Sequence, residues 1–300
     1  MFARAEDTRL SLERDGVEWP NRKASRMVKA GGLRWHFQLM GTGPALLLIH
    51  GTGAATHSWR AMAPLLARRF TVLAPDLPGH GFTGSNGSAT QSLAGMSRAL
   101  AALLNELRFA PDIVVGHSAG AAVLAQLCLN GVIEPKLLVA LNGALAPFEG
   151  LAGHLLPSMA KLLFLNPLAS RFFAWSTDRV AASRLLRGTG SEIEGEGVDY
   201  YVRLFRNPAH VAGALGMMAN WDLHALYREL PRLATRTALI IGEKDKAVSP
   251  LAAQTICARM PNAFVERLRG VGHLAHEEQP AVVADLILRL AEQTGIFEAA

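Results

Sequence analysis

The stretch from Ile113 to Leu129 changes from strand-forming to helix-forming residues across a single serine, Ser118. The residues before this serine are mostly β-branched, and those after it are small or unbranched and favour a helix. Glycines stand two residues away on each side, at Gly116 and Gly120. A strand that becomes a helix across so short a turn predicts a unit of an α/β protein.

Similar units recur along the chain. Continuous apolar runs such as 45–49 are typical of strands buried on both faces of a parallel sheet. The predicted strands are 25–30, 33–39, 45–50, 70–75, 112–116, 137–141, 238–242 and 264–268. The predicted helices are 57–68, 90–108, 119–131, 249–260 and 279–293. This alternation predicts an α/β fold with a mostly parallel eight-stranded sheet and helices on both faces.

The alternation breaks between residues 146 and 233. This interval has no convincing strand, is rich in Leu, Met, Phe and Trp, and carries helix breakers at Pro157, Pro167 and Pro208. We interpret 146–233 as a helical cap inserted in a core formed by 25–145 and 234–300, after a polar lead-in at 1–24. The alternative is a longer set of crossover helices.

The overall charge is mildly basic. The 300 residues are 50% hydrophobic and only 18% charged, which suits one large core and argues against disorder. The net charge is +5 and the basic residues are scattered, as on an ordinary solvated surface. The alternative is affinity for an acidic ligand or for contact with the anionic face of a membrane.

Several function classes find no support in the sequence. Cys128 and Cys257 lie in apolar helical patterns and read as core residues, and no cysteine cluster has metal spacing. No phosphate-binding loop or nucleic-acid pattern occurs, so we expect no cofactor, metal or nucleic acid. The charged first residues predict no signal peptide, and the apolar stretch 112–133 is too polar to span a membrane. We expect a cytoplasmic protein.

The serine has two candidate partners for nucleophilic catalysis. Gly116-x-Ser118-x-Gly120 between a strand and a helix matches a nucleophile elbow, in which a tight turn exposes the serine. A serine hydroxyl needs a base, and the base needs an orienting acid. His273 follows the last predicted strand and Asp245 follows the strand before it. The order Ser, Asp, His is the one expected for this motif.

Acyl transfer also needs donors for the developing oxyanion. We predict the backbone N–H groups of Ala119, at the start of the helix, and Thr52, after strand 45–50, with Gly53 as the alternative. Asn142 stands where the acid could also lie, but an amide cannot replace a carboxylate. Asp76 is predicted to brace a turn, and His276 to begin a helix.

These residues resemble the α/β-hydrolase superfamily over the chain after about residue 25. A narrower resemblance is to the magnesium-chelatase accessory proteins of bacteriochlorophyll biosynthesis. Its segments include HGTGAATHSWR (50–60), APDLPGHGFT (74–83), VVGHSAGAA (114–122), HVAGALGMMANWDL (210–223) and GHLAHEE (272–278). This resemblance implies a role in magnesium insertion, magnesium chelatase as a partner, and a position at the periphery of the photosynthetic membrane.

The resemblance also bears on the ligand. A tetrapyrrole is flat, apolar and carries carboxylates, so it would suit aromatic walls and an arginine. Apolar and aromatic residues of the cap could line such a pocket, although most of them are expected simply to pack the helices. The residues considered are Gly53, His117, Phe164, Phe172, Phe173, Trp175, Met217, Met218 and Trp221, with Arg171, Arg203 and Arg206 as carboxylate partners.

Three functions stay open at the level of sequence. The first is a serine hydrolase that acts on an ester or related acyl bond of an apolar small molecule. The second is a non-catalytic accessory factor that binds a tetrapyrrole or the chelatase and merely keeps the triad. The third keeps the fold but performs carbon–carbon bond hydrolysis or cofactor-free perhydrolysis.

Overall fold

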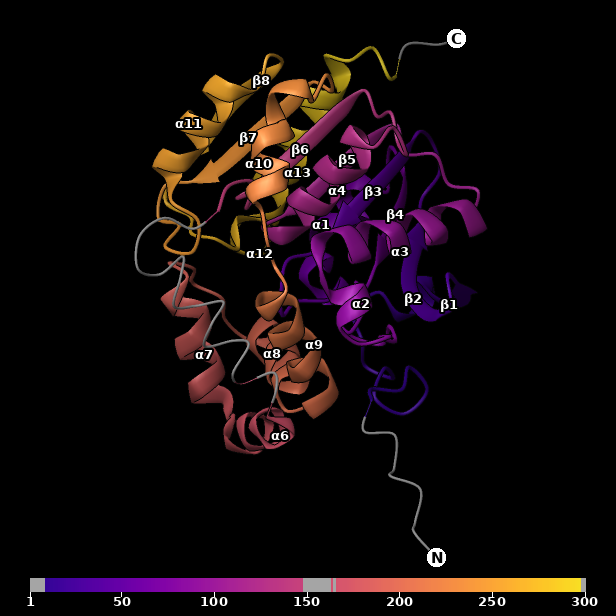
Figure 1. Cartoon of the computed structure of the whole chain (residues 1–300), viewed down its shortest axis with the longest axis vertical. Helices are drawn as coiled ribbons and strands as arrows, with labels where there is room; N and C mark the ends of the chain where they lie inside the picture. Colours follow the sequence, from indigo (N-terminus) through magenta and orange to yellow (C-terminus); the bar gives the residue numbers. More distant parts are fainter. Residues whose placement is uncertain (1–8, 148–162, 164–165, 298–300) are drawn as a thin grey trace, which may run out of the picture.

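The core of the protein is one mixed sheet of eight strands. The computed structural model describes residues 9–147, 163 and 166–297 (Figure 1). The strands are β1 (Ser25–Ala30), β2 (Leu33–Met40), β3 (Ala45–Ile49), β4 (Thr71–Pro75), β5 (Ile113–His117), β6 (Leu137–Leu141), β7 (Thr237–Gly242) and β8 (Ala263–Leu268). Every predicted strand is confirmed to within one residue at each end.

The strand order explains where a site can form. The order is β1-β2-β4-β3-β5-β6-β7-β8, and β2 is antiparallel to both of its neighbours. The strands from β4 to β8 in this order are parallel. Strands β3 and β5 are neighbours, and Leu46 pairs with Ile113. From this pair, β4 is added on the side of β3, and β6, β7 and β8 are added on the side of β5. A crevice is therefore expected at the carboxyl ends of β3 and β5.

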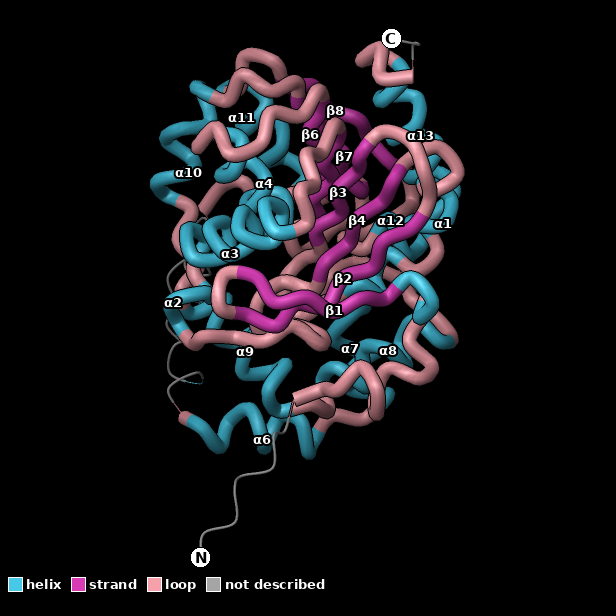
Figure 2. The backbone as a smooth tube through the Cα atoms, turned by 90° about the vertical axis from the view of Figure 1, so that its right-hand side faces the viewer, coloured by secondary structure: helices cyan, strands magenta, loops and turns pink. Residues whose placement is uncertain are grey.

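Helices cover both faces of the sheet (Figures 1 and 2). The core helices are α1 (Met62–Leu66), α2 (Ser88–Gln91), α3 (Leu93–Glu106), α4 (Ala119–Leu129), α11 (Pro250–Arg259), α12 (Ala275–Glu278) and α13 (Pro280–Glu292). Leu100 of α3, Val123 of α4 and Ile256 of α11 belong to the apolar core on one face. Met62 of α1 and Ile287 of α13 belong to the core on the other.

Two predicted helices are interrupted. Segment 57–68 divides into a short 3-10 helix, η2 (Thr56–Trp59), and α1. Segment 90–108 divides into α2 and α3 because Ser92 adopts an extended conformation, and its side chain caps α3 by accepting a hydrogen bond from the N–H of Gly95. Both corrections have one physical reason: local capping and turn formation override the average helical pattern.

Five α-helices lie between β6 and β7 in the part of the chain that the structure describes. They are α6 (Pro167–Ser176), α7 (Arg179–Gly188), α8 (Glu196–Phe205), α9 (Pro208–Ala219) and α10 (His224–Glu229), and α6 to α9 extend away from the sheet toward one end of the molecule (Figures 1 and 2). Side chains start three of these helices: Asn166 accepts from the N–H of Leu168, Asp178 from that of Ala181, and Asn207 from that of His210. These helices form an insert between two strands of the α/β sheet, whereas the predicted boundaries of the insert at 146 and 233 stay a prediction.

Other expectations concern single segments. Among the residues that the structure describes, no helix is both long and apolar enough to cross a lipid bilayer. Cys128 and Cys257 are half-buried free thiols, and burial raises the pKa of Cys128 to about 12. The predicted lead-in and cap include residues 1–8 and 148–162, which lie outside the described residues.

Candidate active site

Ser118 occupies a strained turn between β5 and α4. Its φ of 51° and ψ of −118° place it in a region that residues with a Cβ rarely adopt. The turn is held in place because the N–H of Ser118 donates to the carbonyl of Leu141, and the N–H of Ala144 donates to the carbonyl of Ser118. The side chain is half-buried. This is the local geometry of a nucleophile elbow.

The two flanking glycines are required by packing. A Cβ on Gly116 would come closer than 3.0 Å to the backbone of Ala121, in the first turn of α4. A Cβ on Gly120 would come equally close to the carbonyl of Ile49, at the end of β3. Any larger residue at either position would push α4 away from the sheet and move Ser118 with it.

The candidate base and acid are paired. The Nδ1 atom of His273, in the loop after β8, lies 2.8 Å from Oδ2 of Asp245, in the loop after β7. The other carboxylate oxygen of Asp245 accepts from the N–H groups of Ala247 and Val248 at 2.7 and 2.9 Å. Both side chains are buried. The carboxylate is therefore fixed in place and orients the imidazole through one ring nitrogen.

The backbone carbonyl of His273 is held by two side chains. Nδ2 of Asn142 donates to this oxygen at 2.7 Å, and Nε2 of His117 lies 2.9 Å from it. The rings of His117 and His273 also pack together, with centroids 4.6 Å apart. Because His117 directly precedes Ser118, this contact brings His273 to the elbow. Burial keeps the pKa of His117 well below its usual value, so its ring is neutral.

In the sequence Asn142 is only a poor substitute for the acid, and the structure gives its side chain a different set of contacts. Besides the carbonyl of His273, its Nδ2 donates to the carbonyl of Gly272 at 3.0 Å. Its Oδ1 accepts from the N–H of Gly242, at the end of β7. Asn142 thus ties together the loops that carry Asp245 and His273. The positive φ of 45° at this residue is explained by that task, and sequence alone gives no sign of it.

The predicted oxyanion loop runs beside the serine. A Cβ on Gly51 would lie 3.0 Å from the Cβ of Ser118, so the chain after β3 passes next to the elbow. His50 fixes this loop: its Nδ1 lies 2.8 Å from the carbonyl of Gly51, and its Nε2 accepts from the N–H of Leu77. The hydroxyl of Thr52 donates to the sulfur of Met217 in α9. The cap therefore touches the loop directly.

Asp76 braces the neighbouring loop, as predicted. Its carboxylate contacts His36 Nδ1 at 2.7 Å and accepts from the N–H groups of Thr56 and Phe82. Burial acts to raise the pKa of Asp76, but the rings of His36 and His50 and the hydrogen bonds outweigh it and hold that pKa well below its usual range. The charged carboxylate therefore fixes the start of η2 beside the oxyanion loop.

A second buried network lies beyond His273. The carboxylate of Glu277 in α12 accepts from the hydroxyls of Ser58 at 2.9 Å and Tyr201 at 2.7 Å, and it pairs with Arg60. Nε2 of His276 lies 2.6 Å from the same Ser58 hydroxyl. Burial raises the pKa of Glu277, and Arg60 opposes that rise. The sequence prediction missed this network, although His276 lies in the first turn of α12, as predicted.

The residues considered for a ligand pocket lie in different places. Met217 is buried, Trp221 is half-buried against the core, and Met218 is partly exposed. Phe172 and Trp175 are mostly exposed on α6, and Phe164 lies outside the described residues. Of the arginines, Arg203 donates to the carbonyl of Asp15 and pairs with Glu18, while Arg171 and Arg206 are exposed. The role of these residues stays a prediction.

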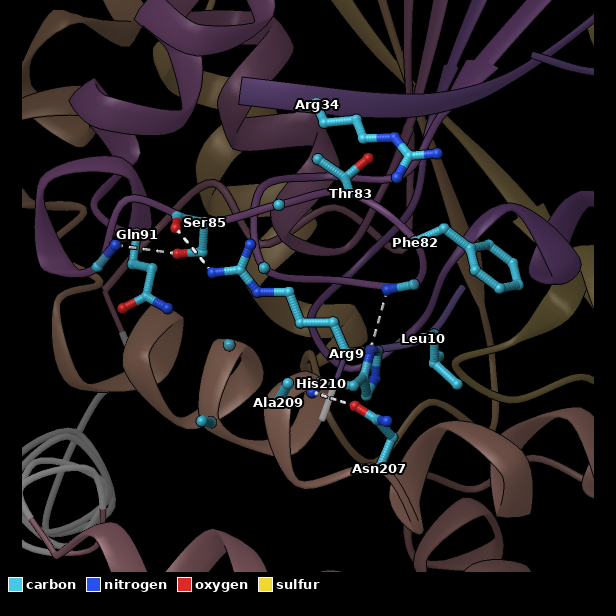
Figure 3. Close-up of a pocket in the computed structure, with 16 residues that line it drawn as sticks. Arg9, Leu10, Arg34, Phe82, Thr83, Ser85, Gln91, Asn207, Ala209 and His210 are labelled. Atoms are coloured by element: carbon cyan, nitrogen blue, oxygen red, sulfur yellow. Dashed lines mark hydrogen bonds between the residues drawn. The ribbon is translucent and has the colours of Figure 1, made fainter. Parts of the chain in front are cut away.

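A separate hollow of about 350 Å³ lies between the N-terminal segment, the loop after β4 and α9 (Figure 3). Arg9, Arg34 and His210 line it, and the three triad candidates are not among its lining residues. His210 connects it to the site, since Nδ1 accepts from the N–H of Gly81 and Nε2 lies 3.1 Å from the carbonyl of Gly53. Among the described residues, no group of three metal-ligating side chains occurs.

Comparison with known proteins identifies the family of the chain. Residues 46–286 match the family model described as "Alpha/beta hydrolase family". The chain belongs to the α/β hydrolase family. This α/β hydrolase is 40% identical over 278 residues to the magnesium-chelatase 30 kDa subunit of Rhodobacter capsulatus, an alignment that covers 91% of this chain and 96% of that protein. The resemblance to the superfamily and to this relative is thereby confirmed.

More distant α/β hydrolases share the fold. A pimeloyl-[acyl-carrier protein] methyl ester esterase of Aromatoleum aromaticum is 28% identical over 269 residues, covering 82% of this chain and 98% of that one. A solved α/β hydrolase fold protein from Burkholderia ambifaria superposes with a TM-score of 0.75 at 21% identity, covering 89% and 97% of the two chains. The expected fold class is therefore confirmed.

Proposed function

We propose that this α/β hydrolase is a serine hydrolase that cleaves an ester or related acyl bond. The observation that carries this proposal is the buried pair of His273 and Asp245, 2.8 Å apart, packed against the elbow that exposes Ser118. A fixed carboxylate, an oriented imidazole and a strained serine at one sheet edge are the parts that acyl transfer requires.

The proposed mechanism follows from these positions. The hydroxyl oxygen of Ser118 attacks the substrate carbonyl while His273 takes the hydroxyl proton, and Asp245 stabilises the imidazolium. The N–H groups of Thr52 and Ala119 receive the oxyanion. His273 then passes the proton to the leaving group, and a water molecule activated by the same ring frees the acyl group. Loss of one oxyanion donor would cost about 3 kcal/mol of transition-state stabilisation.

We further propose that this activity is accessory to magnesium insertion in bacteriochlorophyll biosynthesis. Support comes from the 40% identity to a protein named as a magnesium-chelatase subunit. The substrate would then be an apolar small molecule related to tetrapyrroles, and magnesium chelatase a partner. We place the protein in the cytoplasm, at the periphery of the photosynthetic membrane.

A fluorophosphonate probe tests the nucleophile. The probe should label the wild-type protein at Ser118, and Ser118→Ala should abolish labelling without changing the melting temperature. Ser97→Ala provides the matched control, because Ser97 is a buried serine of α3 that donates to the carbonyl of Leu93. An unlabelled wild-type protein, alongside a labelled control esterase, would contradict the proposal.

The second candidate function is a non-catalytic accessory factor. It is favoured by one observation, namely that the relative from Rhodobacter capsulatus is named as a subunit of another enzyme. Complementation of a deletion strain separates the two functions. If Ser118→Ala restores pigment synthesis as well as the wild type, binding rather than turnover is the biological task. Product analysis then separates ester hydrolysis from carbon–carbon cleavage or perhydrolysis.

A further inference from the structure

The outer face of α6 carries a row of exposed apolar side chains. Leu168, Phe172 and Trp175 are 63%, 67% and 81% exposed, and their spacing places them on one face of the helix. Ala174 and Thr177, from the inner side of this segment, are buried, and α6 packs on α9. A helix face that only contacts water does not need a row of large apolar side chains, so this row indicates an interaction surface.

The next helix adds an exposed apolar side chain and positive charge. Val180, Arg184 and Arg187 of α7 are exposed, and their spacing places them on one face of that helix. Arg171, Arg184 and Arg187 form no ion pair within the described part of the chain. We call seven exposed residues of α6 and α7 the cap-tip surface: Leu168, Arg171, Phe172, Trp175, Val180, Arg184 and Arg187.

The position of the cap-tip surface makes it accessible to a planar surface such as a lipid bilayer. In both views α6 lies at the end of the long axis of the molecule, on the opposite side from α11 and β8 (Figures 1 and 2). A plane can therefore meet α6 without meeting the core of the sheet. A protruding row of aromatic and aliphatic side chains at such an end can enter the interface of a bilayer.

We propose that the cap-tip surface docks on an anionic lipid membrane. Aromatic rings are favoured at the level of the lipid headgroups, and arginines beside them attract anionic headgroups. The unpaired arginines match that negative surface, whereas they would repel a basic one. This inference deepens the proposed peripheral location and rests on it, but it does not depend on the hydrolase chemistry.

Tryptophan fluorescence of the full chain reads the docking directly. Trp19, Trp35 and Trp59 are buried and Trp221 is half-buried, so Trp175 is the tryptophan most exposed to water. Vesicles of phosphatidylcholine mixed with phosphatidylglycerol should shift its emission to the blue, and vesicles of phosphatidylcholine alone should shift it much less. The Trp175→Phe variant should lose the shift and still sediment with the anionic vesicles.

Variants separate the apolar and the charged contributions. Phe172→Ser with Trp175→Ser should abolish sedimentation with anionic vesicles. Arg171→Gln, Arg184→Gln and Arg187→Gln together should weaken it by more than about tenfold, and added salt should weaken the wild type similarly. The matched control is Leu251→Ser with Val282→Ser, which removes exposed apolar side chains from α11 and α13 and should leave sedimentation unchanged.

The outcomes are decisive for this surface. Equal sedimentation of the wild type and the Phe172→Ser/Trp175→Ser variant with anionic vesicles would overturn the proposal. Fluorophosphonate labelling of the wild-type protein is a separate readout, because it reports on Ser118 and not on the cap-tip surface. Lipid binding without labelling would contradict the hydrolase alone, and labelling without lipid binding would contradict the docking alone.

Discussion

The hydroxyl of Tyr201 in α8 donates a hydrogen bond to Oε1 of Glu277 in α12 over 2.7 Å. This bond joins the cap to the short helix that follows His273. Because Arg60 and Ser58 contact the same buried carboxylate, the cap, η2 and the histidine loop share one network. A change in this network is therefore expected to affect both stability and the position of His273.

Replacing Tyr201→Phe tests this connection. The change removes one donor from a buried carboxylate and should lower the free energy of unfolding by about 1–3 kcal/mol. Urea denaturation measures it. Tyr227→Phe is the matched control, because the Tyr227 hydroxyl makes no hydrogen bond within the described residues and its ring packs against Arg259. Equal loss of stability in both variants would show that the bond to Glu277 contributes nothing beyond the loss of a tyrosine hydroxyl.

The pair of Asp245 and His273 predicts a large kinetic effect. Asp245→Asn keeps the shape of the side chain but removes the charge that holds the imidazole in the required tautomer. We expect turnover of an activated ester to fall by about 10⁴-fold with little change in melting temperature. Asp222→Asn is the control, since Asp222 forms a similar contact of 2.7 Å with His224 on the exposed surface. A rate within about tenfold of the wild type would contradict the role of Asp245.

The fold and the triad candidates could be predicted because their signals are local. A continuous apolar run marks a buried parallel strand, and the chemistry of this fold lies just after such strands, where Ser118, Asp245 and His273 stand. The network around Glu277 could not be predicted in this way. Ser58 and Glu277 are separated by 219 positions, and neither lies in a motif that implies the other.

Asn142 shows the same limit at close range. The sequence places it just after β6, where an amide cannot replace the carboxylate of the acid. Its contacts with the carbonyls of Gly272 and His273 depend on how the loop after β8 folds back over β6 and β7. Side-chain to backbone bonds between distant loops follow from tertiary packing and leave no periodic pattern.

Replacing Asn142→Asp tests the support of the histidine loop. A carboxylate would face the carbonyl oxygens of Gly272 and His273 without a donor, so we expect the free energy of unfolding to fall by about 1–3 kcal/mol or more. Turnover should fall as well, because His273 loses its anchor. Asn262→Asp is the control, since Nδ2 of Asn262 donates to a carbonyl at the exposed surface. An unchanged melting temperature for Asn142→Asp would rule out this anchoring role.

The buried histidines predict a loss of stability in acid. Burial lowers the pKa of His210 from 6.5 to about 4, and it also lowers the pKa values of His50, His57, His80 and His276. Between pH 6.5 and 4 the unfolded chain binds a proton at His210 that the folded protein does not. This contribution to stability is therefore complete above pH 6.5 and is lost as the pH falls toward 4, at up to about 1.4 kcal/mol per pH unit for each ring.

The His210→Gln variant isolates one ring of this set. A glutamine amide can still accept from the N–H of Gly81 and donate to the carbonyl of Gly53, but it does not titrate between pH 4 and 7. Urea denaturation at a series of pH values should give a flatter dependence for His210→Gln than for the wild type. Since protonation of His210 would break its acceptance of the Gly81 N–H, an identical slope in both proteins would mean that another group drives the unfolding in acid.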